Sequence, residues 1–228
     1  MDGMKRTKLR ERLLPPYSFR EEMVNMISHA AGGVFAIVAL CTCVCMAAIK
    51  GNTWGVAASA IYGAAMIMLY TMSSLYHGLT APVPKRVFQI IDHCSVFLLI
   101  AGTYTPFTLV SLRPAYPLKA WIIFGVVWGF TILGVVLNSI DLKKFKIFSM
   151  ICYLCTGWSI VSVAPSLIDT LSTPGFVLLI LGGAAYTIGA ILYGVGKKIP
   201  YMHSAFHFLV LIGSILHYIS ILVYVLPM

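Results

Sequence analysis

The chain has 228 residues, of which 60% are hydrophobic and 10% are charged, and its formal net charge is +9. A soluble globular domain carries about 25% charged residues, so this composition excludes an ordinary soluble protein and favours a membrane protein. The positive charge does not indicate a nucleic-acid partner, because much of it lies in the first twenty residues, at Lys5, Arg6, Lys8, Arg10, Arg12 and Arg20. We expect a basic cytoplasmic tail over 1–20 and one transmembrane domain over 21–228.

Seven apolar stretches are long enough to cross a bilayer, which takes about 20 residues of helix. Proline, glycine and charged residues separate these stretches, as expected of connections between helices. The sequence therefore predicts an all-α bundle of seven transmembrane helices over 22–49, 53–77, 88–111, 120–140, 146–168, 174–196 and 202–226.

The distribution of lysine and arginine predicts the orientation of the bundle. Of the 16 basic residues, 13 fall in the tail and in every second connection, and 3 fall on the other side. Cytoplasmic loops of membrane proteins carry the excess of basic residues. We therefore expect a cytoplasmic N-terminus and an external C-terminus, on opposite sides as an odd number of spans requires.

Two local features of the spans lead to further expectations. Pro106 lies inside the third span and should kink it, with the hydroxyls of Thr103 and Thr105 bonding the carbonyls that are freed. Asp141 and Asp169 fall in expected connections, so we expect both carboxylates to be solvated.

Four ionisable residues within the apolar spans are candidates for a functional site. Such groups are costly inside a bilayer unless they are paired or bind a metal. The expected topology brings them to one depth, because His77 ends the second span, Asp92 lies near the start of the third, and His203 and His207 open the seventh. The alternative is that these groups only satisfy one another at the membrane interface.

The spacing of the histidines favours a metal site. His203 and His207 are four residues apart and so share a helix face. With His77 they form a set of three nitrogen ligands that leaves one position open, which is typical of catalytic zinc. We therefore expect Zn²⁺ as cofactor, with Asp92 as general base or orienter of the bound water. Ser73, one turn before His77, is a candidate to bond that water or a substrate carbonyl.

The chain also resembles a known family. The motifs that carry the resemblance are EEMVNMISHAAGG (21–33), SSLYH (73–77), IDHCSVFLLIAGTYTPF (91–107), GGAAYTIGAILY (182–193) and HSAFH (203–207). They are similar to those of the hemolysin III family of bacterial membrane proteins, which is related to the progestin and adiponectin receptor family and more distantly to alkaline ceramidases. The resemblance implies seven helices in a bacterial plasma membrane, zinc bound by the three histidines, and Asp92 in contact with the bound water.

Other polar residues leave alternatives open. Glu22, Asn25 and His29 share one face of the first span, and they either support or relay protons to the metal site or form a hydrogen-bonded seam between helices. We expect His217 to be a satisfied interior histidine, with a transport or proton-path role as the alternative, and His93 to have a packing role rather than to bind the metal. Glu21 is expected at the interface.

These observations predict a zinc-dependent hydrolase of lipid amides or esters, with membrane lipids as its substrates and no soluble protein partner. One alternative is a pore-forming cytolysin, because the bacterial branch of the family is named for haemolysis. Another is a receptor or regulator of membrane lipid state in which zinc is purely structural. The sequence does not indicate an oligomeric state.

Overall fold

A computed structural model describes residues 7–196 and 199–228, and all regular structure in this part of the chain is helical. Seven helices are long and apolar enough to cross a membrane. The predicted all-α bundle of seven spans is therefore confirmed. Four of the basic residues used to predict the orientation, Lys5, Arg6, Lys197 and Lys198, lie outside the described residues.

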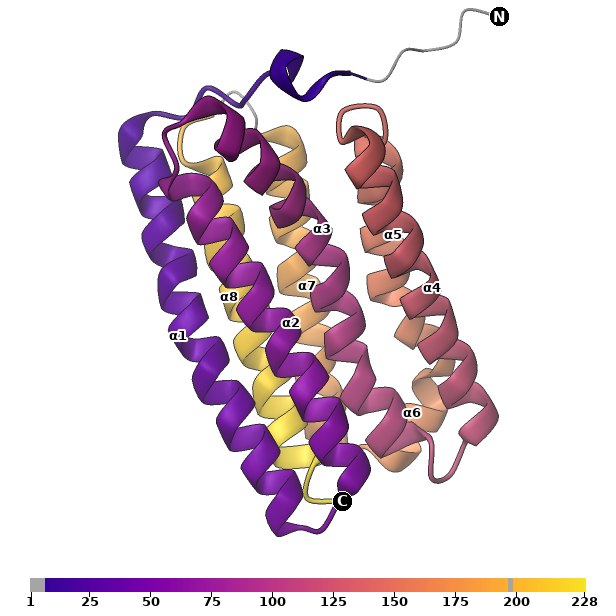
Figure 1. The fold of residues 1–228 in the computed structure, drawn as a ribbon. Coiled ribbons are helices and arrows are strands. Elements are labelled where there is room, and N and C mark those ends of the chain that lie inside the picture. Colours follow the sequence, from indigo (N-terminus) through magenta and orange to yellow (C-terminus); the bar gives the residue numbers. More distant parts are fainter. Residues whose placement is uncertain (1–6, 197–198) are drawn as a thin grey trace, which may run out of the picture.

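The spans run alternately along one bundle axis, and the first begins at the opposite end from where the last finishes (Figure 1). A short 3₁₀ helix, η1 (Leu9–Glu11), precedes them. They are α1 (Phe19–Ile49), α2 (Thr53–Gly78), α3 (Pro82–Pro106) with η2 (Phe107–Leu112), α4 (Pro117–Asp141), α5 (Lys146–Trp158) with η3 (Ser159–Val163) and α6 (Ala164–Thr170), α7 (Thr173–Val195), and α8 (Met202–Ser220) with η4 (Ile221–Val225).

The third span starts six residues earlier than the sequence suggested, at Pro82 rather than 88. The segment 82–86 was expected to be a connection because of its two prolines. Proline is tolerated in the first turn of a helix, where the backbone N–H has no helical partner. Pro82 and Pro84 therefore begin the helix instead of breaking it, and Lys85 becomes a buried helical residue.

Pro106 changes the helix type of this span. The helix continues beyond Pro106 as the π-helical segment η2, and such wider turns commonly absorb an irregularity in a helix. Thr103 donates to the Leu99 carbonyl and Thr105 to the Ala101 carbonyl. The carbonyl that loses its partner at Pro106 is that of Gly102, so the expectation that these hydroxyls bond the freed group was wrong.

The fifth span is not the continuous helix expected over 146–168. It narrows to the 3₁₀ segment η3 at Ser159–Val163 before α6 resumes. The Tyr104 hydroxyl, from α3, stabilises this break, because it donates to the Gly157 carbonyl at 2.7 Å and accepts from the Ile160 N–H at 3.0 Å. A side chain from a neighbouring helix thus replaces bonds that a regular helix would make within itself.

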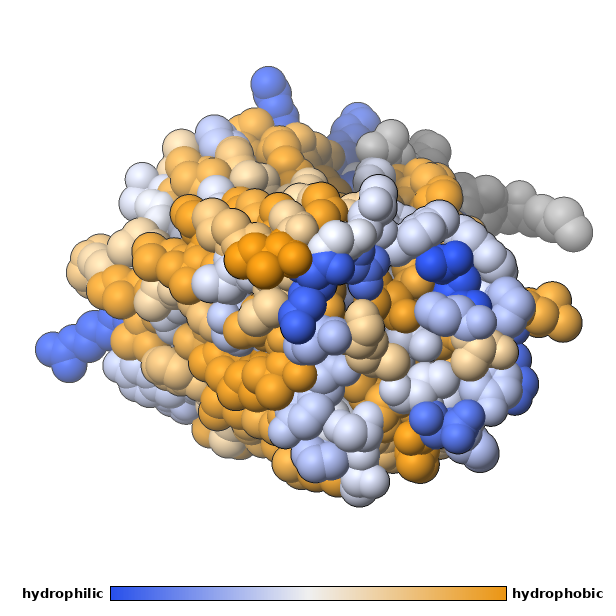
Figure 2. Space-filling view, turned by 90° about the horizontal axis from the view of Figure 1, so that it is seen from below, coloured by the Kyte–Doolittle hydropathy of each residue, from blue (hydrophilic) through white to orange (hydrophobic). Residues whose placement is uncertain are grey.

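The core of the bundle contains residues of α1, α2, α3 and α8, and it extends to α4 through Ala120, Ile123 and Val127. Tyr62, Met66 and Tyr70 of α2 are almost completely buried there. The Tyr70 hydroxyl donates to Ser214 Oγ of α8 at 2.7 Å, which ties the second span to the last. α4 and α5 stand apart from α2 and α8 (Figure 1), and hydrophobic side chains cover much of one side of the bundle seen end-on (Figure 2).

An N-terminal strap, residues 7–18, lies across the end of the bundle at which α1 begins (Figure 1). The Thr7 N–H donates to the Asp141 carboxylate at 2.9 Å, and the buried Arg12 guanidinium donates to the Ile140 carbonyl at 3.1 Å. Arg86 of α3 donates to the Arg12 carbonyl. Asp141 therefore ends α4 as a buried strap anchor, which corrects the expected solvated carboxylate, whereas Asp169 is exposed.

We expect Gly134→Ala, in α4, to destabilise the bundle, because the added methyl would overlap the fully buried Phe97 ring of α3. Overpacking of this kind costs about 1–3 kcal/mol. Gly129→Ala in the same helix is the matched control, since its methyl meets no described atom within 4 Å. Thermal unfolding in a single detergent should show a lower Tm for Gly134→Ala only; equal Tm values would contradict the close α3–α4 packing.

Candidate metal centre

Three histidines from two distant spans converge at the end of the bundle that the strap covers. Nε2 of His203 lies 3.2 Å from Nε2 of His77 and 3.0 Å from Nε2 of His207. The nitrogen atoms that the three rings offer all lie within 4.8 Å of one another. The helix ends that the sequence placed at one depth thus meet in space.

Hydrogen bonding among three neutral rings leaves at least one of these two contacts poorly satisfied. Nδ1 of His77 donates to the Glu22 carboxylate at 2.6 Å, so in the neutral ring Nε2 carries a lone pair. If Nε2 of His203 carries a proton, it can serve His77 but has no lone pair for His207. If it carries none, two lone pairs face each other across 3.2 Å. A cation between the three nitrogens resolves the conflict.

The spacing of the nitrogens suits a small divalent metal. Two imidazole nitrogens bound tetrahedrally to zinc at about 2.0–2.1 Å lie about 3.3–3.4 Å apart. The two closest separations in the triad, 3.2 and 3.0 Å, are near this value. The residues present therefore fit a three-histidine zinc site.

The carboxylate of Glu22 in α1 supports the site from the side of His77. It contacts Nδ1 of His77 through one oxygen and Nζ of Lys85 through the other, at 2.9 Å. Lys85 also donates to the Leu79 carbonyl at the end of α2. The lysine keeps the carboxylate ionised, and the carboxylate fixes the tautomer and orientation of the imidazole, as outer partners of metal-binding histidines commonly do.

The other two residues singled out on α1, Asn25 and His29, contact α8. The His29 ring stacks on His207 with centroids 3.6 Å apart and an interplanar angle of 19°. Asn25 accepts a hydrogen bond at 2.6 Å from Ser204, which lies between the two histidines of α8. One face of α1 therefore combines both readings of the sequence, since Glu22 supports a candidate ligand while Asn25 forms a seam with α8.

The strap closes the site from the end of the bundle. The Tyr17 ring stacks on His203 with centroids 4.9 Å apart and an interplanar angle of 13°. Burial, together with the nearby Tyr193 and Glu22, raises the pKa of Tyr17, so this phenol remains neutral at physiological pH. The next residue, Ser18, caps α1 and forms a capping box with Glu21, which sets the position of Tyr17. Glu21 also accepts from the Tyr201 N–H, joining the starts of α1 and α8.

Asp92 and Ser73 line a cavity of about 150 Å³ that also reaches His203 and His207. Asp92 is outside the group of three histidines, and its carboxylate lies 3.6 Å from Nδ1 of His93. Ser73 is buried, and its hydroxyl has no hydrogen-bond partner within the described part of the chain. A buried polar atom without a partner calls for an explanation, and a bound ligand would supply one.

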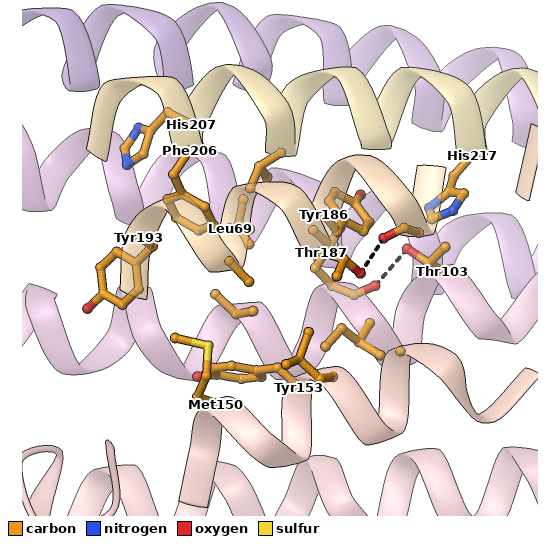
Figure 3. Close-up of a pocket in the computed structure, with 18 of the residues that line it drawn as sticks. Leu69, Thr103, Met150, Tyr153, Tyr186, Thr187, Tyr193, Phe206, His207 and His217 are labelled. Atoms are coloured by element: carbon orange, nitrogen blue, oxygen red, sulfur yellow. Dashed lines mark hydrogen bonds between the residues drawn. The ribbon is translucent and has the colours of Figure 1, made fainter. Parts of the chain in front are cut away.

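The cavity extends from the triad along the bundle axis and is lined by α2, α3, α5, α7 and α8 (Figure 3). His207 and Tyr193 lie at one end of it, and His217 and Thr103 at the other. Most of the lining is apolar, from residues such as Leu69, Leu99, Met150, Leu154, Ile180 and Val210. This shape suits a hydrocarbon chain whose polar end lies at the histidines.

The remaining candidate residues have defined places. His93 spans from α3 to α7, with Nδ1 on the Gln89 carbonyl and Nε2 3.3 Å from the Tyr193 hydroxyl. His217 is buried at the far end of the cavity, as predicted, but it is not fully satisfied, because its Nδ1 has no hydrogen-bond partner among the described residues. Neither is a member of the triad.

Two residues at the site were missed by sequence reasoning. Lys85 was counted only as a topology signal, because its segment was taken for a loop; a single lysine behind two helix-starting prolines was the available clue. Tyr17 was assigned to the tail. The capping box at Ser18 and Glu21 indicates that α1 starts directly after Tyr17, which could have placed this ring near the histidines.

Comparison with known proteins agrees with this architecture. The family described as Haemolysin-III related matches residues 17–218. Hemolysin-3 of Bacillus cereus is 37% identical over 208 residues, covering 91% of this chain and 93% of the relative. The Hemolysin-3 homolog of Bacillus subtilis is 36% identical, with 91% and 96% covered. The human monocyte to macrophage differentiation factor is 25% identical over 209 residues, covering 88% and 83%.

The fold and the site define a multi-pass cell-membrane protein with a histidine triad at one end of the seven spans in the described part of the chain. The chain belongs to the haemolysin III-related family. The match starts at Tyr17, so the end of the strap, the Glu22–His77 pair and the triad all fall within it.

We expect Glu22→Gln to weaken zinc binding about 10–100-fold, the usual effect of losing an outer partner of a metal-binding histidine. Glu21→Gln is the matched control, because Glu21 contacts Ser18 and Tyr201 rather than the triad. Dialysis of both purified variants against zinc buffers, followed by elemental analysis, gives the two affinities. Equal affinity in Glu22→Gln and the unaltered protein would show that the carboxylate does not support the metal.

Proposed function

We propose that the protein is a zinc-dependent hydrolase that cleaves an amide or ester bond of a membrane lipid. The observation that carries the proposal is the position of the triad at the polar end of a long apolar cavity that also holds Asp92 and the unpartnered hydroxyl of Ser73. This combination provides a metal-binding group, a base, a hydrogen-bond donor and a place for an acyl chain in a single space.

The surroundings of the cavity favour a substrate that arrives from the bilayer. The strap lies over the triad at the end of the bundle, with the Tyr17 ring on His203. Between α5 and α7, contact is sparser, and the exposed Trp158 forms a hydrogen bond from α5 to Thr187 of α7 at 2.9 Å. The basic residues around the triad end favour the cytoplasmic leaflet as the source of the lipid.

The residues divide the chemistry of hydrolysis among them. A zinc ion held by His77, His203 and His207 would lower the pKa of a water molecule and polarise the substrate carbonyl. Asp92 takes a proton from water while the water oxygen forms a bond to the carbonyl carbon. Ser73 donates a hydrogen bond to the carbonyl oxygen. Asp92 then passes the proton to the leaving nitrogen or oxygen as its bond to carbon breaks. The products are a fatty acid and an amine or alcohol.

The name of the bacterial relatives, Hemolysin-3, supports a second candidate function, pore formation. A pore would release dye from liposomes whether or not the three histidines are present. Under the proposed function, liposomes with the protein remain sealed, while lipid cleavage depends on the histidines. A receptor or regulator with structural zinc would give neither leakage nor cleavage, and loss of the metal would only lower its stability.

We expect Asp92→Asn to lower the rate of lipid cleavage by about 10²–10⁴-fold, the contribution typical of a positioned general base. Its zinc content should be unchanged, because Asp92 is outside the metal-holding group. Asp169→Asn is the control, since this exposed carboxylate contacts Tyr116 instead. Release of fatty acid from a ceramide in proteoliposomes measures the rate. Full activity in Asp92→Asn would remove this residue from the mechanism.

Ser73 and its neighbour Ser74 offer a paired prediction. Ser73→Ala should lower turnover while leaving stability equal or higher, because it removes a buried hydroxyl that has no partner within the described residues. Ser74→Ala should leave turnover unchanged and lower the free energy of unfolding by about 1 kcal/mol, since Ser74 donates to the Met26 carbonyl of α1. Thermal unfolding and the ceramide assay separate the two effects; a stability loss in Ser73→Ala without loss of turnover would assign it to packing.

A further inference from the structure

The end of the cavity remote from the triad holds a second polar group that the proposed chemistry does not use. His217 of α8 is buried and lines the cavity together with Thr103 of α3 (Figure 3). Its Nδ1 has no hydrogen-bond partner anywhere in residues 7–196 and 199–228. An imidazole nitrogen left without a partner in an apolar interior is costly, so its function requires an explanation.

The other ring nitrogen determines what Nδ1 can bind. Nε2 of His217 lies 3.0 Å from the Leu179 carbonyl of α7. A carbonyl oxygen only accepts, so Nε2 carries the proton. A charged imidazole is expensive at this depth of an apolar bundle, so the ring is neutral and Nδ1 is a bare hydrogen-bond acceptor. Its partner must be a donor.

Three hydroxyls that line the cavity already donate to other groups. Thr103 donates its proton to the Leu99 carbonyl, and Thr187 donates to Gly183 while accepting from Trp158. The Tyr104 hydroxyl donates to the Gly157 carbonyl. The protons of these three hydroxyls are therefore engaged within the protein, and none of them is available to Nδ1 of His217. A bound group that donates would supply the missing partner.

The length of the cavity places this acceptor at the far end of a lipid chain. His203 and His217 are fourteen residues apart on one helix, or about 21 Å at the helical rise of 1.5 Å per residue. Half of a bilayer core, the depth that the chains of one leaflet fill, is about 15 Å thick. The separation of the two histidines is thus comparable with the length of a lipid chain. The volume of about 150 Å³ is about ten times what one water molecule needs. The space therefore suits an extended chain whose end reaches His217.

We propose that His217 forms a second binding subsite, which recognises a hydroxyl group at or near the terminal carbon of an acyl chain whose carbonyl lies at the histidine triad. The hydroxyl donates to Nδ1 of His217, and the Thr103 oxygen offers a second acceptor beside it. This inference rests on the proposed function for the position of the carbonyl end, and it adds the class of chain that the site prefers.

The test compares palmitic acid with ω-hydroxypalmitic acid for binding to the purified full chain, by displacement of radiolabelled palmitic acid. One hydrogen bond at His217 should favour the hydroxylated chain by about two- to tenfold. His217→Gln retains a donor for Leu179 but loses the acceptor at the position of Nδ1, so the preference should vanish. His217→Asn restores a polar atom at the position of Nδ1 and should retain part of the preference.

Each outcome separates the subsite from the proposed function. Binding of palmitic acid without any advantage for the hydroxylated chain would overturn the subsite alone and indicate water at His217. Failure of both chains to bind would overturn the acyl cavity, and with it the proposed function. A preference that persists in His217→Gln would also overturn the assignment to Nδ1. Because the first comparison uses the unaltered protein, it stands even if a variant does not fold.

Discussion

The 2.6 Å contact between the Glu22 carboxylate and Nδ1 of His77 is the interaction on which the site depends. It fixes the proton on one side of the ring and so turns the other nitrogen, as a lone pair, toward His203. Lys85 holds the carboxylate from its other oxygen, so a charge that would be costly within the membrane end of the bundle is compensated on both sides. α1, α2 and α3 are joined at this one group, and α8 completes the triad.

Composition and spacing predicted most of this architecture in physical terms. Seven apolar stretches could only be satisfied as helices in a bilayer, and the i, i+4 spacing of His203 and His207 put both rings on one face. His77 could be added because alternation of the spans set its depth. None of these inferences required knowledge of side-chain packing, since they follow from helical periodicity and from the thickness of a membrane.

What the sequence could not predict depends on contacts between distant segments. The 3₁₀ break after Trp158 depends on the Tyr104 hydroxyl of another helix. The burial of Asp141 depends on a strap that folds back from residues 7–12. The sequence could not decide whether Glu22 belongs to a hydrogen-bonded seam or to the metal site. It showed which helix face carries Glu22 but not which residues lie beside that face. The cavity likewise arises from the loose packing of α5, which leaves no mark in local hydrophobicity.

Two of the three triad histidines lie on the last span, and Glu22 lies at the start of the first. The site therefore cannot assemble during translation until α8 has left the ribosome and inserted beside helices made much earlier. A chain that lacks the last span, or in which that span inserts wrongly, still has α3 as a wall of the cavity but lacks His203 and His207 beside His77. The group of three histidines is therefore complete only in a chain whose last span has been made and inserted.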